Sequence, residues 1–232
     1  MKFLSKFLIF TLFFAPLSTA TILAQPSSVN ASATDSKANT LLDKVKKQYN
    51  SYSSLESKFK LEFKLAEQPK AETMSGKVYQ QGDNFRAEMG NDFVIGNGQM
   101  IWQKSGNTVQ IKNANSKDAD ELMTPKTLIR MYEKKEFVFG ITGESAEGWS
   151  KKATILTGKP TNRRSEFTKI VLAIDQKTNH IVSVTAYSRD QSRSKVSLDA
   201  PSVNQKYNSS IFNFDKSQFP GVKVQDLRID CQ

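Results

Sequence analysis

Residues 55 to 65 alternate almost throughout between apolar and charged side chains, and this pattern constrains the fold more than any other part of the chain. A period of two predicts a β-strand, because successive side chains of a strand point to opposite faces of the sheet. One solvent-exposed polar face and one apolar face are typical of an antiparallel sheet. The apolar positions are Leu55, Phe59, Leu61, Phe63 and Leu65, and the charged positions are Glu56, Lys58, Lys60, Glu62 and Lys64.

Further short strands follow at the spacing of an all-β barrel or sandwich, separated by turns rich in Gly and Asn. Within this series the dipeptide Asn97-Gly98 predicts a tight hairpin, because both of its residues tolerate positive φ. The strands are expected over residues 75–80, 85–89, 93–95, 100–103, 109–111, 137–139, 153–156, 167–174 and 181–187.

Helical periodicity interrupts the strands and does not alternate with them. One helix is predicted where Leu41, Leu42, Val45, Tyr49 and Tyr52 recur at helical spacing. A second short helix is predicted after Thr124-Pro125, with Thr as the N-cap and Pro at the first helical position. This order disfavours a doubly wound parallel sheet. A large antiparallel sheet should curl, so we expect a mainly β fold, an incomplete antiparallel β-barrel of about 10–11 strands with a lid of two to three α-helices.

The first 24 residues have the organisation of a secretory signal peptide. Lys2 and Lys6 precede an apolar run, and small residues lead to two candidate cleavage positions, after Ala20 or after Ala24. The apolar run is interrupted before it reaches the roughly 20 residues of a membrane-spanning helix. We therefore expect export to the periplasm, and a protein that is soluble there after cleavage.

The rest of the chain is predicted to form one domain. Residues 25–36 are small and polar, as in a flexible leader, and residues 37–232 are enough for a single domain with its own core. The only cysteine, Cys231, cannot form an internal disulfide and is expected in a solvated tail, although pairing between two chains stays possible.

Charge and side-chain chemistry exclude several classes of function. The formal net charge of +10 favours acidic partners, including anionic membrane surfaces. The basic residues are scattered singly, which argues against nucleic acid. The lone His180 is expected in a surface turn, and no motif for a nucleophile, a metal or a phosphate is present. We expect no catalytic residues, no metal, no cofactor and no enzymatic activity.

Large apolar side chains are abundant for a chain of this size: it has fifteen Phe, six Met, six Tyr and two Trp. For any single residue, a place in an ordinary core is the simpler interpretation. Taken together, they favour a lined cavity, because a curled sheet with a thin helical cover has more inner surface than its helices can fill. Flexible Met and planar rings suit variable apolar ligands.

The C-terminal segment carries the first specific resemblance. Phe212-Asn213-Phe214 precedes Phe219-Pro220-Gly221-Val222, and Val224, Asp226 and Arg228 follow. This ending resembles that of the outer-membrane lipoprotein carrier (LolA-like) family. Other landmarks occur in the family's order over about residues 38 to 229. They are Leu42, Tyr49, Leu55, Gly76, Phe85, Asn97-Gly98, Trp102, Val109 and Thr124-Pro125-x-x-Leu128-Ile129.

The resemblance implies an incomplete β-barrel with a helical lid, and a monomeric periplasmic shuttle. Such a shuttle takes acylated lipoproteins from an inner-membrane ABC transporter to an outer-membrane acceptor. The family often has an Arg-Pro pair after the second strand, whose Arg latches the lid. Here Gly82-Asp83 stands at that place, and Arg86 is the candidate latch.

The alternation and the predicted helix together give a hypothesis for the lipid-binding residues. On the sheet side it comprises Phe59, Leu61, Phe63, Trp102 and Ile111, and on the lid side it comprises Leu128, Met131 and Tyr132. Three alternatives stay open on the same scaffold. They are a carrier of another envelope lipid, such as a glycolipid or a polyketide-type chain, a module that senses lipid or misfolded envelope components, and a structural domain with a filled core.

Overall fold

A computed structural model describes residues 35–114, 133–144 and 152–228. These residues contain one α-helix, α1 (Ser36–Asn50), two 3₁₀ turns, η3 (Ser209–Phe212) and η4 (Lys216–Gln218), and one sheet of thirteen strands. The strands are β1 (Leu55–Lys64), β2 (Glu72–Gln81), β3 (Asn84–Met89), β4 (Asp92–Asn97), β5 (Met100–Ser105), β6 (Thr108–Asn113), β7 (Phe137–Gly143), β8 (Ala153–Pro160), β9 (Phe167–Asp175), β10 (Ile181–Ser188), β11 (Arg193–Leu198), β12 (Ser202–Val203) and β13 (Lys223–Asp226).

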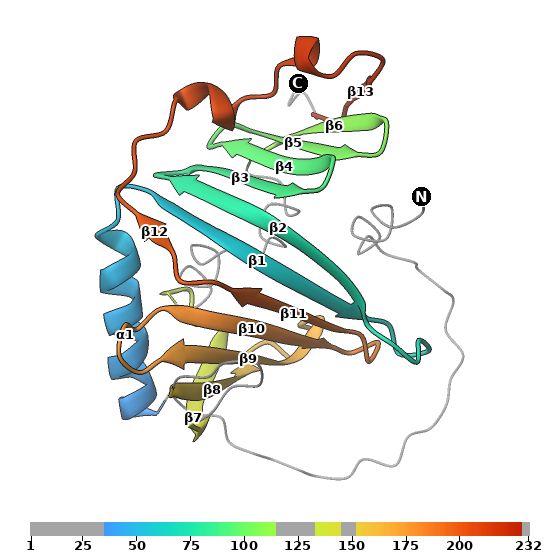
Figure 1. Ribbon diagram of the computed structural model, residues 1–232. Helices are drawn as coiled ribbons and strands as arrows, with labels where there is room; N and C mark the ends of the chain where they lie inside the picture. The colour runs from blue at the N-terminus through green and yellow to red at the C-terminus, as the bar shows by residue number, and fades with distance from the viewer. Residues whose placement is uncertain (1–34, 115–132, 145–151, 229–232) are drawn as a thin grey trace.

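The strands form one open, curled sheet in the order β13-β6-β5-β4-β3-β2-β1-β11-β10-β9-β8-β7, with β12 beside the start of β1. The long β1–β2 hairpin joins the part formed by β3–β6 to the part formed by β7–β11 (Figure 1). All paired strands are antiparallel except β13, which runs parallel to β6. The expected incomplete antiparallel barrel is therefore confirmed. The sequence did not predict β11, β12 and β13, which have few large apolar side chains in alternation.

Side chains just outside both ends of helix α1 satisfy free backbone groups, and at its C-terminal end the Ser51 hydroxyl donates to the backbone oxygen of Gln48 at 2.7 Å. Asp35 is the N-cap and accepts a hydrogen bond from the backbone N–H of Lys37 at 2.8 Å. The buried residues Ala38, Leu42 and Val45 follow helical spacing and form one apolar stripe. The helix is thus the one expected from the sequence, but it starts earlier, and Tyr52 lies just beyond its end.

The stripe of α1 packs on one face of the sheet, which we call the inner face. Its core contains Leu156 of β8, Leu172 of β9 and Val184 of β10, which are paired across neighbouring strands. Burying this stripe removes apolar surface from water, at roughly 25 cal/mol per Å². The helix therefore covers the β7–β10 part of the inner face. The second helix expected after Thr124-Pro125, residues 25–34 of the leader, the signal segment and Cys231 lie outside the described residues, whereas residues 35–36 of the expected leader cap and begin α1.

The opposite face, the outer face, has its own core beneath the C-terminal segment. Residues 204–228, the C-terminal strap, cross the upper part of the sheet and end on β13 (Figure 1). The rings of Phe214 and Phe219 stack with centroids 5.7 Å apart, and Phe219 lies 5.1 Å from the buried Phe93 of β4. Gly221 has a φ of 79°, which turns the chain into β13. The family-like C-terminal motif thus closes the outer face.

The hairpin at Asn97-Gly98 forms by a different geometry from the one expected. Gly98 has a φ of 81°, but Asn97 is the last residue of β4 and is not in the left-handed region. Its side-chain oxygen accepts hydrogen bonds from the backbone N–H groups of Gln99 and Met100, at 3.1 and 2.9 Å. The asparagine therefore stabilises this turn through its side chain.

Among the described residues, no helix has both the length and the apolar character needed to cross a membrane.

Candidate functional site

The inner face of β1–β3 presents large apolar side chains that are only partly covered. Register fixes which residues share this face, since directly paired residues of an antiparallel sheet point to the same side. Leu61 pairs with Met74, and Phe59 pairs with Leu198, which packs against the core beneath α1. The half-buried members are Phe59, Phe63, Met74, Phe85 and Met89, and the buried members on β1, β2, β4 and β5 are Leu55, Leu61, Val78, Val94 and Ile101.

Two of these rings lie flat because a glycine faces each of them on the neighbouring strand. Phe59 pairs with Gly76, and a Cβ at Gly76 would come within 2.6 Å of the phenyl ring. Phe85 pairs with Gly96 in the same way, with a distance of 2.2 Å. Aromatic side chains often cover strand glycines across a ladder. The rings therefore spread over the backbone, which gives the inner face a broad apolar surface.

The residues that the sequence suggested for the sheet side of a cavity lie on two opposite faces of the sheet. Phe59, Leu61 and Phe63 share the inner face, as expected. Trp102 and Ile111 pair with each other on the outer face and belong to the core beneath the strap. The ladder that shows this is continuous from β1 to β6: Glu56, Tyr79, Arg86, Ile95, Trp102 and Ile111. The two groups cannot line one cavity, because alternation along each strand sends them to opposite sides.

Arg86, the candidate lid latch, also lies on the outer face. Its Nη1 donates to the backbone oxygen of Ile211 in the strap at 3.0 Å, and its Nε donates to Glu88 at 2.6 Å. The guanidinium lies 5.5 Å from the ring centroid of Phe93. Arg86 therefore holds the strap, and it faces away from the side on which α1 packs. The lid residues Leu128, Met131 and Tyr132 lie outside the described residues.

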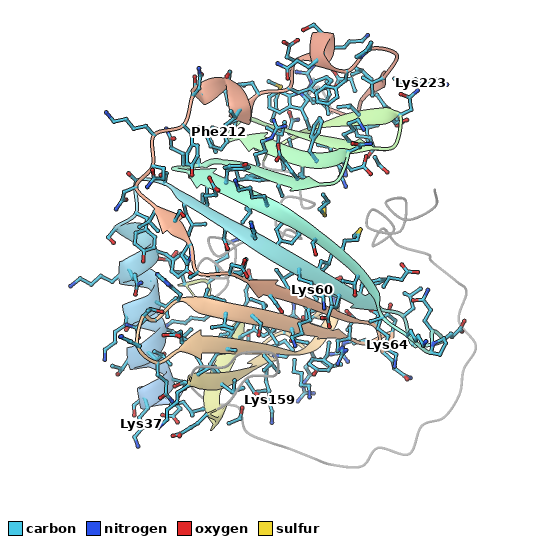
Figure 2. The ribbon with its side chains drawn as sticks, in the orientation of Figure 1. Lys37, Lys60, Lys64, Lys159, Phe212 and Lys223 are labelled. Atoms are coloured by element: carbon cyan, nitrogen blue, oxygen red, sulfur yellow. The ribbon has the colours of Figure 1, made fainter. Side chains whose placement is uncertain are left out.

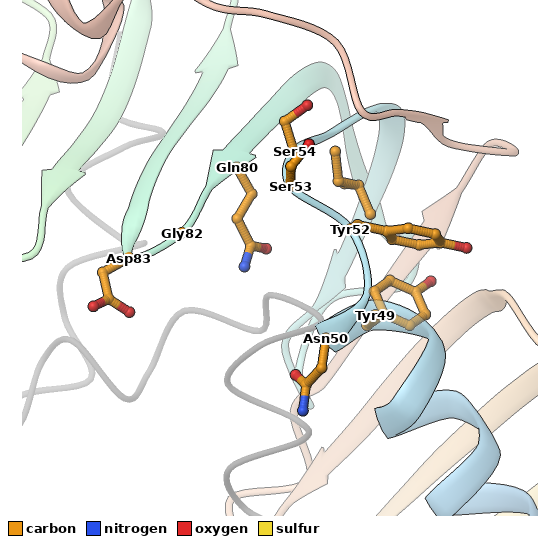
Figure 3. Close-up of a pocket in the computed structure, with 9 residues that line it drawn as sticks. Tyr49, Asn50, Tyr52, Ser53, Ser54, Gln80, Gly82 and Asp83 are labelled. Atoms are coloured by element: carbon orange, nitrogen blue, oxygen red, sulfur yellow. The ribbon is translucent and has the colours of Figure 1, made fainter.

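A polar pocket of about 220 Å³ lies at the rim of the inner face, between the end of α1 and the β2–β3 turn. Leu55 and Gln80, which pair on the inner face, both line it, so the pocket adjoins the apolar surface. Figure 3 shows Gln80 and Asp83 on the β2 side, and Asn50 with two tyrosines on the α1 side. Amide and carboxylate groups here could bind a polar group next to an apolar chain. The sequence did not single out this pocket, because its parts lie on separate segments.

The two tyrosines are fixed by a hydrogen-bonded network. The Tyr49 hydroxyl accepts from the backbone N–H of Ile181 at 3.1 Å, and burial raises the pKa of Tyr49 above its usual range. The Tyr52 hydroxyl accepts from Gln48 at 2.6 Å and lies 2.8 Å from Nε2 of His180. Burial lowers the pKa of His180. This histidine was expected on the surface, but it is half-buried and supports the pocket wall from behind.

The residues at this site do not indicate hydrolytic chemistry. In the pocket, Ser53 Oγ donates to Asn204 at 3.2 Å and Ser54 Oγ donates to the backbone of Gln205 at 2.6 Å. The His180 ring bonds to a phenol, so these contacts do not form a serine–histidine pair. Within residues 35–114, 133–144 and 152–228, no group of three or more His, Cys, Asp or Glu side chains could hold a metal ion.

Comparison with known proteins agrees with the fold. An uncharacterized conserved protein from Thermus thermophilus superposes with a TM-score of 0.54 at 13% identity, covering 82% of this chain and 99% of that one. Lower scores are found for the Mycobacterium tuberculosis lipoprotein LppX (0.45, 12% identity, 73% and 98% covered) and a LolA superfamily protein from Nitrosomonas europaea (0.40, 10%, 76% and 97%). No curated protein matches the sequence.

The sequence profile described as outer membrane lipoprotein carrier protein LolA matches residues 50–215. This range includes β1 to β12, all residues that line the polar pocket except Tyr49, and Phe214 of the strap. The match covers most of the chain, and the expected resemblance is confirmed. The chain belongs to the LolA outer membrane lipoprotein carrier family.

Proposed function

We propose that this protein is a periplasmic carrier that shelters the acyl chains of lipoproteins on its inner face. In this proposal, residues 1–24 direct export, the chain is released as a soluble monomer, and its cargo passes from an inner-membrane ABC transporter to an outer-membrane acceptor. The family membership supports the class of cargo. The observation that carries the proposal is the broad, partly covered apolar surface of β1–β3, beside a part of the same face that α1 covers.

Physical chemistry explains why such a surface is useful. Transfer of a hydrocarbon chain into water costs about 0.8 kcal/mol per methylene, so a chain of about sixteen carbons faces a barrier of roughly 12 kcal/mol. A carrier has to offer an apolar environment similar to that of the membrane, so that the cargo can enter and leave. Flat rings and flexible Met side chains suit this role, because they accept chains of different shape. The rim pocket would then take the polar group joined to the chains.

Binding of a fluorescent sixteen-carbon fatty acid tests the proposal at the inner face. Phe59→Gln and Phe63→Gln replace half-buried rings there, and each should weaken binding by about tenfold, since a partly buried Phe contributes about 1.5 kcal/mol. Val171→Gln is the matched control, because Val171 is also half-buried but pairs with Thr185 on the outer face. All three variants should remain folded, as judged by their thermal unfolding.

Two results would contradict the proposal. The first is probe binding that weakens equally in the control and in the inner-face variants, because the effect would then come from general destabilisation. The second concerns the native protein purified from the periplasm. Its native mass spectrum should show bound lipid or acylated lipoprotein, whereas a mass equal to that of the chain alone, together with no probe binding, would favour a structural domain with a filled core.

A further inference from the structure

A row of basic side chains crosses the outer face near the end of β1 that is distant from α1, where Figure 2 labels Lys64. Lys64 of β1 pairs with Arg193 of β11, Arg193 pairs with Tyr187 of β10, and Tyr187 pairs with Lys169 of β9. Lys159 of β8 extends the row. Gly158 pairs with Ile170 in antiparallel register, so the next residue of β8, Lys159, lies opposite Lys169, the residue before Ile170. We call Lys64, Arg193, Lys169 and Lys159, with Tyr187 among them, the basic row.

The basic row places basic side chains directly opposite each other, although such like-charge pairs destabilise a sheet. Within residues 35–114, 133–144 and 152–228, none of its four cations has a carboxylate oxygen within 4.0 Å. Lys169 Nζ lies 4.3 Å from the ring centroid of Tyr187. The neighbouring carboxylate on this face, Glu62, is bound to Lys60 at 2.8 Å, and this bond lowers the pKa of Glu62, as do the nearby charges of Lys195 and Arg193.

Adjacent turns add further positive charge at this end of the sheet. Arg163 and Arg164 are exposed in the β8–β9 turn. Arg189 holds that turn in place by donating to the backbone oxygens of Ser165 and Arg163, at 2.6 and 2.7 Å. Two acids, Glu166 and Asp190, also lie in these turns, and Asp190 accepts a hydrogen bond from the Ser192 hydroxyl at 2.7 Å. Among the described residues of the row and these two turns, the cations therefore outnumber the carboxylates.

We propose that the basic row docks the protein on a bilayer surface rich in anionic phospholipid. The row spans five strands, or about 19 Å at the usual strand spacing of about 4.8 Å. Its cations lie side by side on one face and do not converge on a point, so they match an extended anionic surface better than a single small anion. Tyr187 adds a ring with a polar tip, which suits the headgroup region. This inference does not depend on the apolar inner face or on its cargo.

The test is co-sedimentation of the protein, without its signal segment, with vesicles at low ionic strength. Vesicles of phosphatidylcholine with about one third phosphatidylglycerol should bind it, and pure phosphatidylcholine vesicles should not. Each Lys or Arg near an anionic membrane strengthens binding by about fivefold. The triple variant Lys64→Gln, Arg193→Gln and Lys169→Gln should therefore bind on the order of 100-fold more weakly.

The matched control removes the same charge from the exposed side of α1, with Lys37→Gln, Lys44→Gln and Lys47→Gln. This variant should keep most of the vesicle binding. Equal loss in both triple variants would overturn the proposal, because net charge alone would then explain binding. Failure of the unaltered protein to bind anionic vesicles would also overturn it. Binding to soluble polyglutamate in place of the vesicles would assign the row to an acidic protein partner and would overturn it as well. Fatty-acid binding, measured in parallel, should be unchanged in both variants.

Discussion

Replacement of Phe212 by Ala tests whether the C-terminal strap is part of the folded core. Its side chain is 1% exposed, and it ends η3, which contacts β3 and β4. Full burial of a Phe side chain contributes about 2 to 3 kcal/mol. The cavity that the truncation leaves closes only in part and adds a further cost, so Phe212→Ala should lower the free energy of unfolding by about 4 kcal/mol. For a domain of this size, that corresponds to a fall in melting temperature of about 12 °C.

Urea unfolding followed by circular dichroism measures this change, and hydrogen exchange locates it. The backbone N–H groups of Lys223 and Leu227 donate to Asn107 and Ile111 on or beside β6, each at 2.9 Å. These amides should exchange faster in the variant, because the strap would open at lower cost. Phe214→Ala serves as a graded control, since Phe214 is half-buried and should lose about 2 kcal/mol. A loss below about 1 kcal/mol for Phe212→Ala would refute the packing of the strap.

Three further predictions follow from single contacts. Gly76→Ala should lower the free energy of unfolding by about 2 kcal/mol or more, because the new Cβ would lie 2.1 Å from the backbone oxygen of Glu88. Urea unfolding measures this loss. Burial lowers the pKa of His180 below its ordinary 6.5, so the unfolded chain binds the proton more readily, and stability falls as the pH drops from 7 to 5. In His180→Gln, which keeps a polar partner for Tyr52, that part of the slope should vanish. Arg86→Met should cost about 1 to 2 kcal/mol through the lost strap contact, yet leave fatty-acid binding unchanged.

Each of these predictions has its own control or contrary result. Gly140→Ala is a matched strand substitution, because a Cβ there would meet no atom within 4 Å, and it should be nearly neutral. A stability difference between pH 7 and pH 5 that is the same with and without His180 would show that this residue does not titrate on unfolding. If Arg86→Met weakened fatty-acid binding without loss of stability, a latch on the ligand side would be favoured over a clamp on the strap.

The sequence alone predicted the mainly β class, α1 and the strand character of residues 55–65. These features depend on periodicity, which is local. The C-terminal aromatic motif could also be recognised in the sequence, and the structure showed that it packs against Phe93. Neighbouring residues determine helical or extended backbone, since each step of φ and ψ is restricted by adjacent side chains.

Tertiary structure alone decided which apolar residues share a face. Phe59 and Trp102 both belong to strands rich in apolar residues, yet the ladder sends them to opposite sides. A shift of register by one residue would exchange the faces, and register depends on turns and pairings far along the chain. The same reason applies to Arg86, which binds Ile211, 125 residues away, and to the basic row, where Lys64 meets Arg193. Periodicity gives each strand two faces, and only the pairing of all strands decides which face lies inside.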